Sequence, residues 1–274
     1  MMRRALIAGL LALTPAGLWA HDMFLVLSDH SLAPNSAVSV SLFNGTFDKS
    51  ENAIARDRMT DVSVVDGSAE VSHPATEQWR DEESVAILDF ETGSPGTYLV
   101  GISTAANMIE LTAEEFDDYL QHDGVLDVFQ ARQHEGDLEQ PVRERYSKHV
   151  KTILQVGDAV TDSHSIKLGY PIEIVPLANP ASVDVGDTVE FLVLANGNPV
   201  PDQLVYASYD GFHSHDGDDA HRESASARTD ENGVVKVELS KSGRWYVRLI
   251  RMLPVDEEGA DYESNWATLT FQIE

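Results

Sequence analysis

Short runs of alternating apolar and polar residues fill the region from His21 to about Ser103. Five of them are rich in Val, Leu, Ile and aromatic residues, and Gly, Pro, Asn and Asp separate them: residues 24–28, 37–45, 61–67, 84–92 and 96–103. Short β-rich runs between turn residues predict strands. The alternation in AVSVSLF at 37–43 predicts one buried face, so we expect an antiparallel sandwich over residues 21–107.

The pattern changes to a helical period near residue 108. Thr112 and Glu115 have capping-box spacing, Phe116 and Leu120 share a helical face, and Gly124 is a stop signal. A second short helix is predicted in VLDVFQARQ. Pro141 can begin a third helical segment, which turns into a strand before Gly157. Residues 108–156 are therefore predicted to be a helical insertion.

The β pattern returns over residues 157–274. SARTDENGVVKVELSKSGRWYVRLIRM predicts three strands joined by Asn-Gly and Ser-Gly turns, and SNWATLTFQIE predicts a last strand. This segment is predicted to be an Ig-like or prealbumin-like sandwich. The expected fold class is thus all-β, with two antiparallel β-sandwich domains and a helical insertion between them.

The first twenty residues have the order of a secretory signal peptide. Arg3 and Arg4 precede an apolar run to about Leu13, and a small-residue segment ends in Ala20. We expect cleavage after Ala20, an exported protein with His21 as its first residue, and a periplasmic location. The absence of cysteine excludes disulfides and thiolate chemistry, and it suits a bacterial periplasm.

The formal net charge of -27 restricts the partners. An acidic surface repels phosphate backbones, so no nucleic-acid partner is expected, and it attracts cations. Solvation of the surface is the simpler explanation of the acidity. The sequence has no GxSxG, HExxH, P-loop or GxGxxG motif in the context that catalysis requires, so we do not expect an enzyme.

Histidine is the residue type that suggests chemistry. With cleavage after Ala20, His21 offers a free α-amine and a ring nitrogen, which together chelate one metal ion; Asp22 could add an oxygen. The alternative is a histidine that follows the leader by chance.

A second group of histidines lies in DGFHSHDGDDAH. His213 and His215 are two residues apart, and His221 follows an acidic turn at Gly217. In an extended chain the first two share a face, and a dense His/Asp tract is typical of metal binding. The alternative is a solvated polar loop. The six other histidines are interpreted as structural.

Several segments together resemble the DUF4198 family: AHDMFL, RERYSKHVKTILQVG, GYPIEIVPLANP, HSHDGDDAHRESASARTDENGV and SGRWYVRLIRM. Members are periplasmic proteins described as components of cobalt or nickel uptake systems. The resemblance implies a β-rich protein that binds a divalent transition metal, nickel or cobalt, with copper and zinc also compatible. It places the ligands at His21, His213, His215 and His221.

The function expected from these observations is capture of a metal ion or metal chelate and support of its uptake by a membrane metal importer. Two alternatives stay open at the sequence level. One is a metal-free extracellular Ig-like adhesion or ligand-binding module, in which the histidine loop is incidental. The other is a copper protein with an N-terminal histidine brace, which would need exposed aromatic residues at a flat surface.

Overall fold

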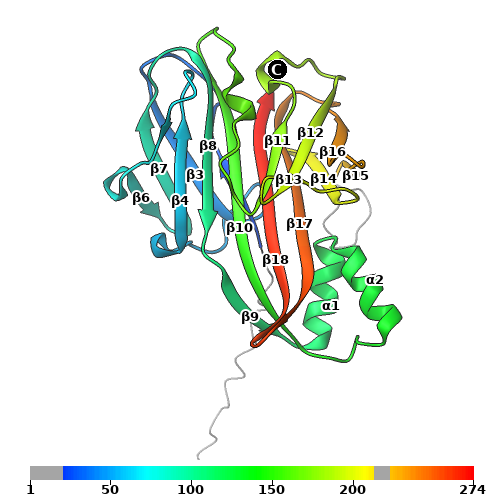
Figure 1. Cartoon of the computed structure of the whole chain (residues 1–274). Coiled ribbons are helices and arrows are strands. Elements are labelled where there is room, and N and C mark those ends of the chain that lie inside the picture. The colour runs from blue at the N-terminus through cyan, green and yellow to red at the C-terminus, as the bar shows by residue number, and fades with distance from the viewer. Residues whose placement is uncertain (1–20, 213–222) are drawn as a thin grey trace, which may run out of the picture.

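The computed structural model describes residues 21–212 and 223–274, and in this part of the chain it is built from three β-sheets and two α-helices (Figure 1). The largest sheet has ten strands. Its main path runs β15-β14-β17-β18-β10-β8-β4-β5, and β2 and β9 also pair with β10. The strands are β2 (Ser31–Leu32), β4 (Met59–Val65), β5 (Val71–Ser72), β8 (Gly96–Thr104), β9 (Asn107–Leu111), β10 (Val142–Val156), β14 (Leu204–Tyr209), β15 (Ala225–Arg228), β17 (Gly243–Glu257) and β18 (Ala260–Ile273). The expected all-β fold class is confirmed.

A four-stranded sheet packs on one face of this large sheet. It consists of β1 (Asp22–Val26), β3 (Ala37–Gly45), β7 (Val85–Glu91) and β6 (Trp79–Glu82), all antiparallel. Leu25 and Leu42 pack with Val150 of β10 in its core. The hydroxyls of Thr268 and Thr270 on β18 donate to carbonyls of β1, which fixes this sheet against the large one.

A second four-stranded sheet covers the opposite face. Its strands are β11 (Ile172–Pro176), β12 (Thr188–Ala195), β13 (Asn198–Pro199) and β16 (Val234–Glu238). Phe191 packs against Phe271 and Trp245 in its core. Side chains alternate between the faces of a strand. On β18, therefore, Thr268 and Thr270 face β1, while Leu269 and Phe271 face β11 and β12.

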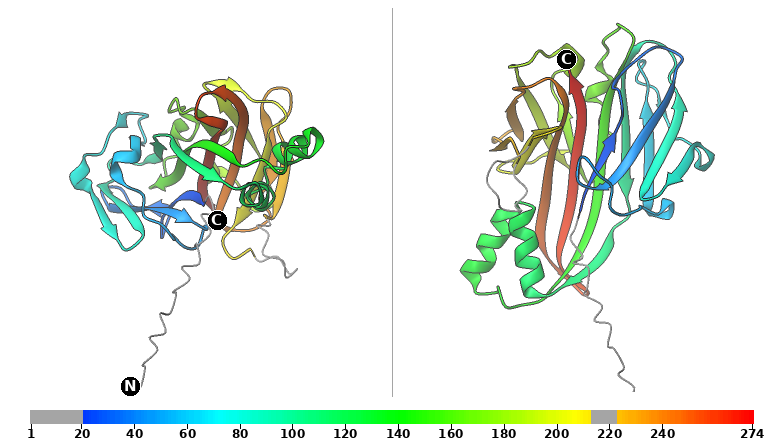
Figure 2. Two further views of the ribbon diagram at one scale, coloured as in Figure 1. Left: turned by 90° about the horizontal axis from the view of Figure 1, so that it is seen from below. Right: turned by 180° about the vertical axis from the view of Figure 1, so that it is seen from behind.

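The two helices, α1 (Ala113–His122) and α2 (Leu126–Glu135), lie at one end of the molecule (Figure 2). The predicted capping box is confirmed: Thr112 accepts from the Glu115 amide, and the Glu115 carboxylate accepts from the Thr112 amide. Phe116 and Leu120 are fully buried against Trp266 and its neighbours on the face of the large sheet that also carries β1. Short 3-10 turns occur at Arg56–Arg58, Thr76–Gln78, Asp162–Ser165 and Pro180–Ser182.

The third segment of the predicted insertion contains no helix. Residues 142–156, which the sequence predicts to turn into a strand only before Gly157, form the fifteen-residue strand β10 over their whole length. Its two faces are both buried, and it lies between β8 and the parallel strand β18, more than a hundred residues away in sequence. Because the long strands β10, β17 and β18 run through one continuous sheet, the two halves of the chain share a core. The boundaries at 107/108 and 156/157 stay predictions.

Candidate functional site

His21 lies directly before β1, on the face of the large sheet that carries the helices. Its Nε2 atom is 3.3 Å from Oε2 of Glu51, and its side chain is about one-quarter exposed. Its carbonyl accepts a hydrogen bond from Nζ of Lys148, which also donates to Oδ1 of Asn44 at 3.1 Å. The first predicted ligand therefore has an accessible imidazole beside a carboxylate, and its main chain is held by a buried lysine.

The other three predicted ligands, His213, His215 and His221, lie outside the described residues. The segments on both sides of them are described. Before them, the Phe212 ring packs edge-on against Tyr209 at the end of β14, with centroids 5.4 Å apart. After them, Glu223 leads into β15 and its side chain is buried.

Arg248 connects the start of β1 to the described segment that begins at Glu223. It lies on β17, on the face toward β1, and its side chain is 1% exposed. Its Nε atom donates to Oε1 of Glu223 at 2.6 Å and lies 3.4 Å from Oδ2 of Asp22. The residue after His21 and the residue two positions after His221 thus share one guanidinium group.

Two further buried groups complete this arrangement, and we call the five residues Asp22, Asp123, Lys148, Glu223 and Arg248 the Arg248 cluster. Asp123 ends helix α1, and its carbonyl accepts from Nη1 of Arg248 at 3.2 Å. The cluster therefore joins five parts of the fold: the start of β1, the end of α1, strand β10, strand β17, and the segment before β15.

The electrostatics of the cluster follow from burial. Burial and then the charge of Asp22 raise the pKa of the Asp123 carboxyl well above its usual range. Burial lowers the pKa of Lys148 to about 8, against the attraction of Asp22. Burial would also lower the pKa of Arg248, but the charges of Asp22 and Glu223 raise it above its ordinary value.

Glu144 extends the buried acid beyond the cluster. Its Oε1 atom accepts from the Tyr119 hydroxyl at 3.2 Å and from the Ser264 hydroxyl. Burial raises its pKa to about 7, although these two hydrogen bonds oppose the shift. Among the described residues, Oε2 of Glu144 and Oδ2 of Asp22 are buried oxygens without a hydrogen-bond partner. The region is therefore rich in carboxyl oxygen. Nη2 of Arg248 is likewise a buried atom without a hydrogen-bond partner in the described part of the chain, although it forms an ion pair with Oε1 of Glu223.

Within residues 21–212 and 223–274, no three His, Asp or Glu side chains are arranged as a metal-binding group. Histidines of the β core have structural partners. His149 contacts the hydroxyls of Ser103 and Ser147 at 2.9 and 3.1 Å, and burial lowers its pKa to about 4. His164 contacts the carbonyl of Thr161 at 3.3 Å.

Sequence reasoning identified His21 and Asp22 but missed Arg248, Lys148, Asp123 and Glu223. One signal was available: Arg248 occupies an inward position of the apolar run WYVRLI, where an unpaired cation would be costly. Its partners could not be identified, because they lie 226, 125 and 25 positions away along the chain.

The structure defines an all-β protein that has a buried charge cluster at the start of its first strand. The family model for DUF4198, a domain of unknown function, matches residues 18–252, so the chain belongs to the DUF4198 family. No curated protein matches the chain. In the described part of the chain, neither helix has the length and apolar character to cross a membrane.

Solved structures give only distant similarities. Salmonella alpha-2-macroglobulin reacted with methylamine is 12% identical with a TM-score of 0.26; the alignment covers 93% of this chain and 15% of that one. The D0-D1 domain of intimin is 13% identical over 92% and 97% of the two chains, with a TM-score of 0.20. The Escherichia coli adhesin FdeC is 14% identical over 91% and 64%, with a TM-score of 0.21.

Proposed function

We propose that this protein is exported to the periplasm, binds one divalent late first-row transition-metal ion, nickel or cobalt, and supports its uptake by a membrane importer. The proposed ligands are the amine and imidazole of His21 together with the imidazoles of His213, His215 and His221. The metal is the cargo of the protein, and no catalytic step is proposed.

The observation that carries the proposal is the pair of contacts that Arg248 makes to Asp22 and Glu223. Asp22 directly follows one proposed ligand, and Glu223 lies two residues beyond another. Ligands from two distant parts of a chain can bind one ion only if the fold brings their backbones together. Arg248 contacts Asp22 and Glu223, which lie near these ligands in the sequence, and so keeps the two segments of the chain close together.

The donor chemistry of the described residues fits such an ion. The imidazole of His21 is accessible and lies beside Glu51, which can hydrogen-bond the ring and orient it. Nitrogen donors favour nickel, cobalt, copper and zinc over magnesium and calcium. The excess of carboxylates, with a chain charge of -27, favours approach of a cation.

Chelation by the amine of His21 requires a processed chain. We propose removal of residues 1–20, which would expose that amine next to the Arg248 cluster. Mass spectrometry of the protein recovered from a periplasmic extract tests this step directly, with a mature mass beginning at His21 as the expected result. A chain that retains the leader would remove the amine from the proposed ligand set.

Calorimetric titration of the chelator-treated exported protein with nickel, cobalt, copper and zinc tests the function. We expect one ion per chain with a dissociation constant tighter than about micromolar, roughly 8 kcal/mol. His21→Ala and the triple variant His213→Ala, His215→Ala, His221→Ala should each weaken binding at least about tenfold.

A matched control removes exposed histidines from elsewhere on the surface. His73 and His134 are both exposed, so the double variant His73→Ala, His134→Ala should bind metal as the unmodified protein does. If the control and the triple variant lost the same affinity for metal, the binding would be nonspecific binding by histidine. Absence of binding by the unmodified protein would overturn the proposal.

A further inference from the structure

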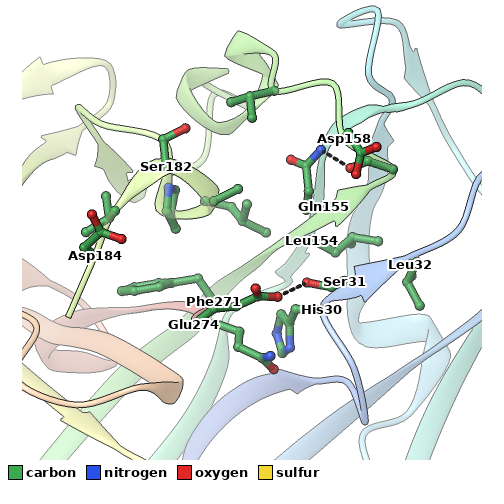
Figure 3. Close-up of a pocket in the computed structure, with 17 residues that line it drawn as sticks. His30, Ser31, Leu32, Leu154, Gln155, Asp158, Ser182, Asp184, Phe271 and Glu274 are labelled. Atoms are coloured by element: carbon green, nitrogen blue, oxygen red, sulfur yellow. Dashed lines mark hydrogen bonds between the residues drawn. The ribbon is translucent and has the colours of Figure 1, made fainter.

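A cavity of about 620 Å³ lies beside the C-terminal residue Glu274 (Figure 3), at the opposite end of the fold from the helices (Figure 1). It forms where the two central parallel strands separate. β10 and β18 pair as far as Thr152 and Thr270, after which β10 pairs with β2 instead. The loop at 157–160 and the 3-10 turn at Pro180–Ser182 close the sides of the resulting gap. Its volume lies in the range of small-molecule sites.

The charge of the cavity wall has one sign. Asp158, Asp184 and Glu274 contribute carboxylates, and none of the described residues that line the cavity is Lys or Arg. Figure 3 places Asp184 and Asp158 on opposite sides of the space, with Glu274 between them. Glu274 accepts a hydrogen bond from the Ser31 hydroxyl at 3.1 Å. The side chains of Asp158 and Asp184 have no ion-pair partner among the described residues.

The inner wall combines apolar surface with a neutral polar group. Phe271, Leu154 and Leu32 supply hydrocarbon. His30, which is 4% exposed, lies beside them, and the side chain of Gln272 interacts with its ring. Burial, and then the charge of Arg244, lower the pKa of His30 to about 4, so this ring is neutral at the pH of the periplasm.

We infer that this cavity binds an aliphatic diamine or polyamine, whose ammonium groups pair with the carboxylates at its rim and whose methylene chain covers the apolar wall. The opposed positions of Asp158 and Asp184 favour two separated positive charges over one. An anion would face only negative charge. A fully hydrated metal ion would leave the apolar wall uncovered, and a neutral alcohol would leave the carboxylates unpaired.

His30 is held by the protein itself. The Gln272 side chain, which also lines the cavity, interacts with the ring, and the Thr152 hydroxyl lies 3.4 Å from its Nε2 atom. The ring therefore adds a fixed, neutral polar edge to the inner wall.

Titration of the purified exported protein with cadaverine at low salt tests the inference, with pentylamine and pentanol as matched ligands. We expect one cadaverine per chain, weaker binding of pentylamine by about tenfold, and no binding of pentanol. Because the rim is exposed, cadaverine affinity should fall as salt is added.

The double variant Asp158→Asn, Asp184→Asn should lower the affinity for cadaverine by at least about tenfold. Both side chains are exposed, so the variant is expected to fold, and circular dichroism checks this. The control is Asp256→Asn combined with Asp137→Asn, which removes the same charge from exposed positions outside the cavity.

Three results would overturn the inference: no cadaverine binding at millimolar concentration, equal losses in the double variant and its control, or equal affinity for pentanol and cadaverine. Cavity binding does not depend on the proposed metal site, since none of its lining residues belongs to that site. If the histidine variants lost metal binding but bound cadaverine unchanged, the metal site and the cavity would be shown to be independent sites.

Discussion

Replacement of Arg248 by Met should destabilise the protein strongly, because it leaves two carboxylates buried without their cation. Met keeps much of the volume of the side chain and removes the charge. Arg248, Asp22 and Glu223 have side chains 1%, 3% and 4% exposed, so water cannot replace the lost contacts without opening the structure.

The magnitude follows from the cost of an uncompensated buried charge. Removing one partner of a buried ion pair costs about 3 to 5 kcal/mol. Two carboxylates lose their cation here, so we expect a loss at the upper end of that range, about 4 to 5 kcal/mol. This is a large fraction of the roughly 5 to 15 kcal/mol by which folded proteins are stable.

Urea unfolding near neutral pH measures the change as a shift of the midpoint at unchanged slope. The variant Arg248→Met, Asp22→Asn, Glu223→Gln tests the cause, because neutral amides should recover most of the lost stability.

Two results would refute this reasoning. A loss below about 1 kcal/mol would mean that solvent or other groups compensate the carboxylates, and that Arg248 does not hold the start of β1 to the segment before β15. A full loss that the triple variant fails to recover would mean that the contact of the guanidinium with the Tyr206 ring, whose centroid is 4.9 Å from Cζ, matters more than the pairing with Asp22 and Glu223.

Three other changes test the surrounding core. Glu144→Gln should stabilise the protein near pH 8 by up to about 3 kcal/mol and have little effect near pH 4.5. The folded-state pKa of Glu144 is about 7, so the unmodified protein loses stability as the pH rises from the unfolded-state pKa toward 7. The same shift of the urea midpoint at both pH values would contradict this. His149→Gln should flatten the loss of stability on acidification between about pH 6.5 and 4, since the lowered pKa leaves the folded ring unprotonated there; an unchanged acid-unfolding curve would contradict this. Gly124→Ala should lower the free energy of unfolding by about 2 to 4 kcal/mol, because φ is +75° and a Cβ would meet the Tyr206 ring. Gly136→Ala, with φ at +84° and open space around the Cβ, should lower it by only about 1 kcal/mol. Equal losses in thermal unfolding would contradict the packing argument.

Elements governed by local signals could be predicted from the sequence. The capping box at Thr112 and the apolar pair Phe116 and Leu120 define α1 without tertiary information. The alternating residues 37–43 likewise define most of β3. In these segments local preference and burial agree.

β10 could not be predicted in this way. Its buried residues include Glu144, Lys148, His149 and Lys151, a charge content typical of an exposed helix. They are tolerated because partners from distant segments surround them, such as Glu173, whose carboxylate lies 3.1 Å from Nζ of Lys151. Burial on both faces removes the alternation that identifies a strand.

One part of the candidate site could be predicted from the sequence and the other part could not. His21 was identifiable because a leader pattern precedes it, but the Arg248 cluster depends on contacts across the whole chain. A single arginine in an apolar strand indicates that a partner exists, and only the fold identifies Asp22 and Glu223 as that partner.

The central claim is that His21 and the histidines of residues 213–221 bind the same ion. A double-mutant cycle on nickel affinity tests it most directly, using His21→Ala, the triple histidine variant, and their combination. Ligands of one ion should be coupled, so the combined loss should differ from the sum of the two separate losses by about 1 kcal/mol or more, with one ion bound per chain. Additive losses, or two ions bound per chain, would contradict the shared site.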